Sequence, residues 1–510
     1  MFDDKSPNRI INFRPLFIAA VGAIIGVALF ETLYSAVDDN KTLAVLLLIT
    51  AAVCGGLLVF GSIKGKKTLV VFAAAILLFL ARASAASPDK IEKGAYSLRG
   101  TVSAVSETKS GVVTVSRAEL NGTRLRYRVK LTVSDGSVPE VGDEIEASCE
   151  AKTPSRRFGS YDERLNLLSN GISATASTAE VTVISSGHYP ALRALERVRS
   201  AIRDRIYRLF PDNAPIVAGF LIGDKSGVDE SDLSSFRATG TAHLLSLSGF
   251  HVGVLTALLF FLLPKRFPWI RLVVVSLFLI LYCAVAAFPP SLIRASVMCF
   301  CLMLSEVTEE RRDPLSSLSL AALAVLFISP YELWSVGFRL SFAATLGILL
   351  IMSAGGANSH SAFFNRAASA AAVTIGASAA TTLFTARYFG EFPTYGLAAN
   401  LAVVPLFSVA ITLSFIAVVL GFIIQPAGSI AAWAPDKLVS GTMLLVRRIE
   451  ELPNSRIAVP IPSTLTCVIM LLMLFTISAY VLRPLRKRLL ITLAVFLLFT
   501  ASFAADIIRA

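Results

Sequence analysis

The chain has 510 residues, of which 55% are apolar and only 16% are charged, and its mean hydropathy is +0.69. Soluble domains carry about 25% charged residues, so this composition excludes an ordinary soluble protein and predicts one that crosses a membrane many times. The formal net charge is +12. The placement of the basic residues matters more than their total, because basic loops mark the cytoplasmic side and can also attract anionic lipid or nucleic acid.

Three apolar runs open the chain, each close to the roughly 20 residues that a membrane span needs; they cover about 16–37, 42–62 and 68–85. Most of the basic residues that flank these runs fall on one side of the membrane, namely Lys5, Arg9, Arg14 and the KGKK turn at 64–67. The positive-inside rule makes that side cytoplasmic. We therefore expect three transmembrane helices over 1–87, with the chain leaving them outside the cytoplasm.

Residues 88–190 differ in character. Short runs of alternating polar and apolar residues are separated by NG, DG and GD turns, a pattern typical of short antiparallel strands. Five such strands in about a hundred residues predict a small extracytoplasmic β-barrel of the OB-like kind. The fold class expected for the whole chain is therefore a polytopic α-helical membrane protein with an inserted small β-barrel domain.

One run of this barrel, RLRYRVK, places basic residues at alternate positions of an expected strand, so that all would face one side: Arg124, Arg126, Arg128 and Lys130. Two interpretations stay open, a stripe along which a nucleic-acid backbone lies and an ordinary solvated strand face. The 13 basic and 13 acidic residues of the region favour the second. Tyr127 would point the other way and offers no platform on which bases could stack.

Residues 191–241 form an amphipathic helix and a linker. Apolar residues recur at three- and four-residue steps between 189 and 210, with arginines on the opposite face, which predicts the helix. It lies either on membrane lipid or against its own domain. Turn-forming residues at 223–227 and a short expected helix at 230–237 complete the linker.

The block 242–510 has the composition of a transmembrane channel domain. Its apolar runs cover about 242–263, 271–288, 291–305, 314–329, 334–353, 367–388, 396–424, 463–482 and 489–507. The positive-inside rule places its basic loops in the cytoplasm, and these loops are 264–271, 309–313, the stretch around Arg366 and 483–488.

The run at 396–424 breaks the alternation of sides. It would end inside, yet the run at 463–482 has to begin outside. We expect 396–424 to be re-entrant or split into two half-helices at Pro405, with 434–452 as an amphipathic helix on the outer surface. Irregular backbone at membrane depth is tolerated only beside protein or a water-filled cavity, so this failure of parity indicates a cavity.

Polar residues interrupt the first of these runs, HLLSLSGFHVG (243–253). On a continuous helix a single stripe would carry Thr239, His243, Ser246, either Gly249 or Phe250, and Gly253, with Ser248 and His251 on a neighbouring one. Gly249 and Gly253 form a small-xxx-small pair that permits close helix approach. The polar groups either line a pathway or only brace a tightly packed bundle.

Two arginines, Arg294 and Arg339, each lie a few residues into a later span, at the end expected to be outside. They either form a polar mouth or extend their side chains to the membrane surface.

At these residues the chain resembles the competence proteins of the ComEC/Rec2 type, which are inner-membrane channels for transforming DNA. The resemblance rests on an ordered series of stretches that covers nearly the whole chain. The matching stretches are 219–255, ending in HLLSLSGFHVGVL; PPSLIRASVM, 289–298; DPLSSLSLAALAVLFISPYELWSVGFRLSF, within 311–349; YFGEFPTYGLAANLAVVPL, 388–406; and FGSYDERLNLLSNGI, 158–172.

The resemblance implies a multi-pass protein of the cytoplasmic membrane that takes up single-stranded DNA during natural competence. The positions carried over as a DNA path are Asp224, His243, Ser248, Gly249, His251, Arg294, Arg339 and Asn400. It also implies partners: single-stranded DNA itself, membrane lipid, a DNA receptor, a separate nuclease and a cytoplasmic ATP-driven translocase, since the sequence has no GxxxxGK[ST] loop.

Many members of this family carry a C-terminal metallo-β-lactamase-like domain. Such a domain needs an HxHxDH-type metal cluster, whereas the four histidines here, His188, His243, His251 and His360, form no such pattern. We therefore expect no metal, no cofactor and no enzymatic activity in this chain, which ends after its last span.

Two other classes of function remain open. One is a transporter for a smaller anionic solute, which would use the same polar mouth. The other is a membrane hydrolase with Ser248 as nucleophile and a histidine as base, although no acid that would orient the histidine is evident.

Overall fold

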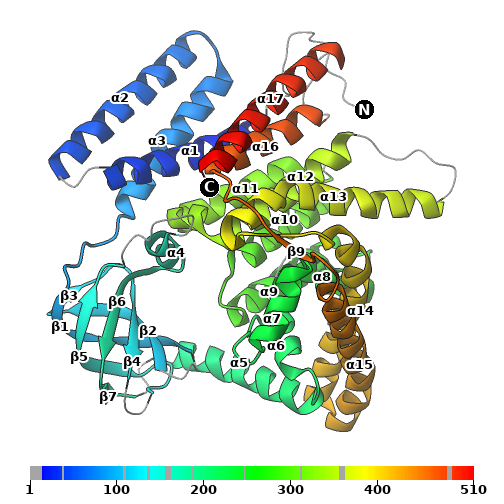
Figure 1. The fold of residues 1–510 in the computed structure, drawn as a ribbon. Coiled ribbons are helices and arrows are strands. Elements are labelled where there is room, and N and C mark those ends of the chain that lie inside the picture. The colour runs from blue at the N-terminus through cyan, green and yellow to red at the C-terminus, as the bar shows by residue number, and fades with distance from the viewer. Residues whose placement is uncertain are drawn as a thin grey trace.

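The computed structural model describes residues 14–36, 40–106, 111–134, 138–154, 162–186, 189–245, 247, 249–309, 313–354, 362–478 and 485–509. Figure 1 shows a β-barrel beside a bundle of helices, and helix α5 (Pro190–Leu209) runs from the lower side of the barrel into the bundle. This arrangement confirms the predicted fold class, a polytopic helical protein with a small inserted barrel.

Three helices precede the barrel: α1 (Pro15–Ala36), α2 (Asn40–Ile63) and α3 (Lys67–Ala85). Ten more follow the linker: α8 (Gly249–Leu262), α9 (Pro268–Val285), α10 (Pro290–Val307), α11 (Pro314–Ile328), α12 (Val336–Ala354), α13 (Ala362–Phe389), α14 (Gly396–Ile423), α15 (Gln425–Glu450), α16 (Thr464–Ile477) and α17 (Leu485–Arg509). Among the described residues, eight helices are long and apolar enough to cross a membrane: α1, α2, α3, α9, α10, α12, α14 and α17. Helices α8, α11 and α16 are apolar but shorter.

The barrel consists of β1 (Gly94–Ser106), β2 (Gly111–Leu120), β3 (Thr123–Arg124), β4 (Arg128–Val133), β5 (Glu144–Lys152), β6 (Ile172–Thr178) and β7 (Thr182–Ser185), with helix α4 (Glu163–Ser169) before β6. Five strands pair in the order β1-β2-β4-β6-β5, and β1 also pairs with β5, so the sheet closes on itself. Only β4 and β6 run parallel within this ring. Alternate residues of β5 are buried, as the period-two pattern predicts.

The expected strand through the basic run is wrong. Strand β3 ends at Arg124 and β4 begins at Arg128, and a bend separates them, so Arg124, Arg126, Arg128 and Lys130 do not form one straight face. The guanidinium of Arg128 turns back to donate to the carbonyl of Asn170. Alternation alone could not reveal this bend, because it depends on contacts of Tyr127 with another part of the chain.

Those contacts belong to what we call the barrel joint, where the barrel meets the helices through Ala86, Tyr127, Arg164, Leu168 and Tyr331. The Tyr127 hydroxyl donates to the carbonyl of Ala86 at the end of α3, and its ring packs edge-on against Tyr331, with centroids 6.3 Å apart. Tyr331 lies in the short 3-10 helix η2 (Pro330–Trp334) between α11 and α12. Arg164 of α4 forms a buried ion pair with Glu31 of α1.

Three helices link the barrel to the bundle: α5 (Pro190–Leu209), α6 (Ala214–Ile222) and α7 (Glu230–Ala238). The start of α5 is tied to the barrel by Arg193, which lies 2.7 Å from Asp143. Its end packs against α14, where the guanidinium of Arg205 lies 5.0 Å from the ring of Phe422. These contacts favour a helix packed on protein at both ends. Helix α6 is buried along its whole length against α14 and α15.

The predicted break at Pro405 is wrong. Helix α14 continues through Pro405, and α15 packs back along it as a 26-residue helix rather than a short surface helix. The two meet so closely at the turn that a Cβ atom on Gly428 would overlap the backbone of Gly421. The flanking strands β8 (Glu391–Pro393) and β9 (Arg456–Ala458) pair antiparallel. Both ends of the hairpin therefore lie together, which removes the parity problem without a broken helix.

Polar contacts join the ends of other helices in pairs. At one set of ends, Arg14, just before α1, lies 2.7 Å from Asp313 before α11, and Arg271 of α9 lies 3.5 Å from Glu306 of α10. At the other set, Arg82 at the end of α3 donates to two carbonyls at the end of α11. Likewise, the Asp506 carboxylate near the end of α17 accepts from the amide of Ser463 before α16, at 2.8 Å.

Candidate functional site

The segment that leads into α8 does not form the continuous helix on which its polar residues would share one face. Helix α7 ends at Ala238, a single 3-10 turn η1 (Ala242–Leu244) follows, and α8 begins at Gly249. Gly240 has a φ of +67° between two buried threonines, Thr239 and Thr241, whose hydroxyl oxygens lie 2.7 Å apart. This glycine turn ends α7. Ser246 and Ser248 lie outside the described residues.

The two histidines are nevertheless close to each other. His243 lies on η1 and hydrogen-bonds to the backbone of Gly240. Part of its surface is exposed to solvent, although many protein atoms lie around it. His251 lies in the first turn of α8 and is fully buried. They are near enough to interact electrostatically. Folding thus brings the pair together through a turn rather than along one helix face.

Two residues of α10 hold the start of α8 in place. The Ser291 hydroxyl donates to the carbonyl of Leu247 at 2.6 Å. One turn further along, the guanidinium of Arg294 lies directly on Gly249, where any Cβ atom would overlap its Nη2. Arg294 also donates from Nη1 to the carbonyl of Ser341 on α12, at 2.8 Å. Arg294 therefore connects α8, α10 and α12.

This geometry corrects two expectations. Arg294 is only 6% exposed, so it does not extend to the membrane surface. Gly253 has open space where a Cβ would lie, whereas Gly249 has none. The close approach depends on Gly249 alone, and the Gly249–Gly253 pair is not a packing motif.

Arg339 serves a different junction. Its Nε donates to the carbonyl of Leu333 at 2.7 Å, and its side chain hydrogen-bonds to Tyr388 of α13. Arg294, by contrast, contacts Ser341, Phe342 and Gly249, and it shares none of these described contacts with Arg339. The two predicted arginines therefore do not meet in one cluster.

Asp224 shapes the loop after α6. Its carboxylate accepts from the Ser226 hydroxyl at 2.6 Å and lies 3.6 Å from Arg203 of α5. Burial raises the pKa of this carboxyl, but the hydrogen bonds from Ser226 and the charges of Arg199 and Arg203 outweigh it and hold the pKa below its ordinary value. The neighbouring Gly223 packs against Leu247, so this loop adjoins the start of α8.

Asn400 lies on the second turn of α14, and no described residue hydrogen-bonds to its buried Oδ1. Buried amide oxygens are usually bonded. Asn400 is thus a polar group without a visible structural partner in the described part of the chain.

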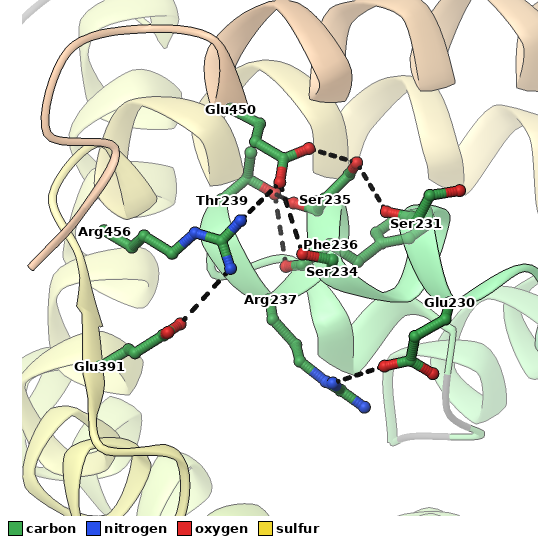
Figure 2. A network of polar contacts seen from close by, with 10 residues as sticks. All are labelled: Glu230, Ser231, Ser234, Ser235, Phe236, Arg237, Thr239, Glu391, Glu450 and Arg456. Atoms are coloured by element: carbon green, nitrogen blue, oxygen red, sulfur yellow. Dashed lines mark hydrogen bonds and ion pairs between the residues drawn. The ribbon is translucent and has the colours of Figure 1, made fainter. Parts of the chain in front are cut away.

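Sequence reasoning missed a polar network that fixes α7 (Figure 2). Glu450 at the end of α15 accepts from the Ser235 hydroxyl and pairs with Arg456 at 3.0 Å. Arg456 reaches Glu391 of β8 at 3.9 Å. Nearby, Arg447 of α15 lies 2.6 Å from Asp232 of α7. The only available signal was the dense charge at 447–456, which alone does not reveal its partners. Ser291 was detectable, since it precedes Arg294 by three residues on an expected helix.

Sequence comparison finds relatives of this chain among known proteins. The chain is 32% identical over 151 residues to "ComE operon protein 3" of Bacillus subtilis, which covers 28% of this chain and 19% of that protein. It is 25% identical over 249 residues to "Recombination protein 2" of Haemophilus influenzae, which covers 46% and 31%. An uncharacterized protein of Aquifex aeolicus is 31% identical over 159 residues, which covers 31% and 37%. These matches span between about a fifth and two fifths of the relatives' own lengths. No solved structure matches with significance.

The family model described as "Competence protein" matches residues 220–484, more than half of the chain. The matched region begins in α6 and includes η1, α8, α10, α12 and the α14–α15 hairpin. Together with the apolar helices that cross the membrane, this match shows that the chain is a multi-pass membrane protein of the competence protein family.

Proposed function

We propose that this protein is a channel that admits single-stranded DNA through the cytoplasmic membrane during natural competence. One observation carries the proposal beyond family membership. Stretches far apart in the sequence, which resemble separate family motifs, meet at the start of α8: His251 of α8, Arg294 of α10 and Ser341 of α12. Because the cluster draws its residues from several motifs, a shared functional role explains it better than a role in local stability.

The physical demands of such a channel fit this composition. A phosphate backbone cannot enter hydrocarbon, so its path is wet and offers donors or cations. Conduction also requires sites that release what they bind. A small number of arginines among histidine, threonine and asparagine side chains satisfies both demands. The channel acts without catalysis of its own. A DNA receptor, a separate nuclease and a cytoplasmic ATP-driven translocase supply capture, strand degradation and energy.

The proposed orientation places the barrel outside the cytoplasm and residues 264–271 and 309–313 inside. Contacts between helix ends support it. Arg14 with Asp313 and Arg271 with Glu306 join ends that this orientation makes cytoplasmic. The barrel joint, which contains Glu31 and Arg164, lies at the opposite ends.

Cysteine labelling tests the orientation. Lys152 of the barrel and Lys265 of the α8–α9 loop are both exposed, so a cysteine at either position is reactive once a reagent reaches it. We expect an impermeant maleimide to label Lys152→Cys in intact spheroplasts and Lys265→Cys only after lysis. Labelling of both positions in intact spheroplasts would contradict this topology.

A clean deletion tests the function itself. We expect it to abolish transformation by linear DNA, and a plasmid-borne copy to restore it. The transporter alternative makes the opposite prediction, because loss of a carrier for a small anionic solute leaves DNA uptake intact. Uptake of fluorescently labelled DNA, scored inside and outside the cytoplasmic membrane, separates a defect in crossing from a defect in capture.

A further inference from the structure

The start of α8 and the side chain of Arg294 bring two positive groups close together. The first backbone N–H groups of a helix have no partner within it, and this end carries a partial positive charge equivalent to about half an elementary charge. Arg294 places its guanidinium on Gly249, the first residue of α8. Like charges in contact repel each other, so this arrangement calls for an anion.

No described carboxylate supplies that anion. Arg294 donates to the Ser341 carbonyl and lies 5.8 Å from the ring of Phe342, but its buried Nε has no acceptor among the described residues. The amides of Gly249 and Phe250 likewise have no acceptor in the described part of the chain. A buried charge without a partner is strongly unfavourable.

We propose that the start of α8 together with Arg294 binds one phosphate oxyanion, and we call this place the phosphate station. Helix starts bind phosphate through their backbone amides, and arginine binds it through paired N–H groups. Gly249 and Phe250 are both partly exposed, so this end of α8 is not sealed off by the rest of the described protein. The inference rests on the proposed function for the source of the phosphate, a phosphodiester of the DNA strand. A lipid headgroup or free phosphate offers the same chemistry.

The station also explains why Ser291 accompanies Arg294. By donating to the Leu247 carbonyl, Ser291 holds the segment before α8 against α10. The amides and the guanidinium are thereby kept in one place before any ligand arrives, and a pre-formed site requires little rearrangement on binding.

Two glycines of α8 provide a matched pair of variants. A Cβ atom on Gly249 would overlap Arg294, whereas a Cβ on Gly253 meets open space. The full-length protein in nanodiscs of neutral lipid is titrated with a short fluorescent single-stranded oligonucleotide. We expect Gly249→Ala to weaken binding by about tenfold, the typical effect of losing a hydrogen bond to a charged group, and Gly253→Ala to leave it unchanged. An oligonucleotide with uncharged methylphosphonate linkages should bind both variants equally.

Further arms separate the sources of phosphate. Inorganic phosphate should raise the thermal midpoint of the wild type and not of Gly249→Ala. If anionic lipid in the nanodisc removes oligonucleotide binding by the wild type alone, the headgroup occupies the same station. Should Gly249→Ala fail to fold, Arg294→Gln replaces it, with the same losses expected.

The outcomes distinguish the station from the channel. If Gly249→Ala and Gly253→Ala bind the oligonucleotide equally and respond equally to inorganic phosphate, the phosphate station is wrong. The proposed channel function is not affected by that result. If the wild type binds no oligonucleotide, the proposed function loses its support. The response to inorganic phosphate then decides the station alone: a difference between wild type and Gly249→Ala supports it, and no difference overturns it.

Discussion

Two regions of the molecule bury an arginine in opposite ways. In the barrel joint, Arg164 faces the carboxylate of Glu31, and both side chains are less than a tenth exposed. At the start of α8, Arg294 is equally buried, but its contacts among the described residues are the Ser341 carbonyl, the Phe342 ring and Gly249, and none of them is acidic. The first arrangement pairs opposite charges and joins two parts of the fold. The second remains incomplete in the described structure, which is what a place that binds an anion reversibly requires.

The largest effect is expected at the barrel joint. Removing one partner of a buried pair leaves the other charge uncompensated, so Glu31→Leu and Arg164→Leu should each lower the free energy of unfolding by about 3–5 kcal/mol. The double variant should lose much less than the sum of the two. Thermal melts of the purified protein and its abundance in membranes measure this. Additive losses would show that the two side chains do not act as a pair.

Glu332 of η2 is an acidic residue whose charge is disfavoured by burial. Burial raises the pKa of this carboxyl to about 7, and the hydrogen bond with Ser335 opposes the rise only in part. Because the folded state holds the proton more tightly than the unfolded state, the contribution of Glu332 to stability is most favourable below about pH 4.5 and becomes less favourable as the pH rises towards 7. Glu332→Gln should flatten this dependence and stabilise the protein by about 2–3 kcal/mol at neutral pH.

Melting temperatures of wild type and Glu332→Gln between pH 5 and pH 7.5 test this, with Glu230→Gln as the exposed control. A parallel pH dependence of the two proteins would show that Glu332 is solvated or paired in solution.

Arginine-to-lysine exchange comes next in size. Lysine cannot reproduce the fork by which Arg294 reaches both Ser341 and the start of α8, so Arg294→Lys should reduce transformation about tenfold at near-normal abundance. Arg339→Lys should also reduce it, through loss of the Nε bond to Leu333. Arg82 is a partly exposed control that donates to helix-end carbonyls, and there lysine should suffice. Full activity of Arg294→Lys would mean that only a positive charge is needed.

The smallest effect is expected in the network around α7, where exposed and half-buried pairs lie close together (Figure 2). Glu230 and Arg237 are both exposed, so Glu230→Gln should change stability by less than about 1 kcal/mol. Glu450 is less exposed and bonds to Ser235 and Arg456, so Glu450→Gln should cost more. Chemical denaturation of the two variants ranks them, and a larger loss for Glu230→Gln would reverse the comparison.

Hydrophobic runs and period-two alternation predicted the transmembrane helices and the barrel, because each rests on local burial that the sequence displays directly. The pairing of elements was less accessible. Nothing in the sequence of α4 shows that Arg164 meets Glu31, which lies 133 positions earlier. The expected break at Pro405 failed for a related reason: a proline can be accommodated within a helix when neighbouring elements support it, and α15 packs along α14.

The candidate site was predicted in part. The residue types of His243, Gly249, His251 and Arg294 stood out because polar groups and glycines within an apolar run need an explanation. Their arrangement did not follow, since the glycine turn at Gly240 separates η1 from α7 and a single helical stripe was assumed. Gly249 and Gly253 differ because only Gly249 packs against Arg294 of α10. The spacing of the two glycines in the sequence does not show which of them contacts a neighbouring helix.

The α14–α15 hairpin bears on how the protein is made. Helix α14 is apolar enough to enter a bilayer by itself, but α15 carries Asp436, Lys437 and two arginines and is absent from the described helices that could do so. The turn between them is tight, and β8 and β9 join the outer ends. We therefore expect the ribosome-bound chain to deliver both helices to the insertion machinery as one unit, with α14 carrying its more polar neighbour into place.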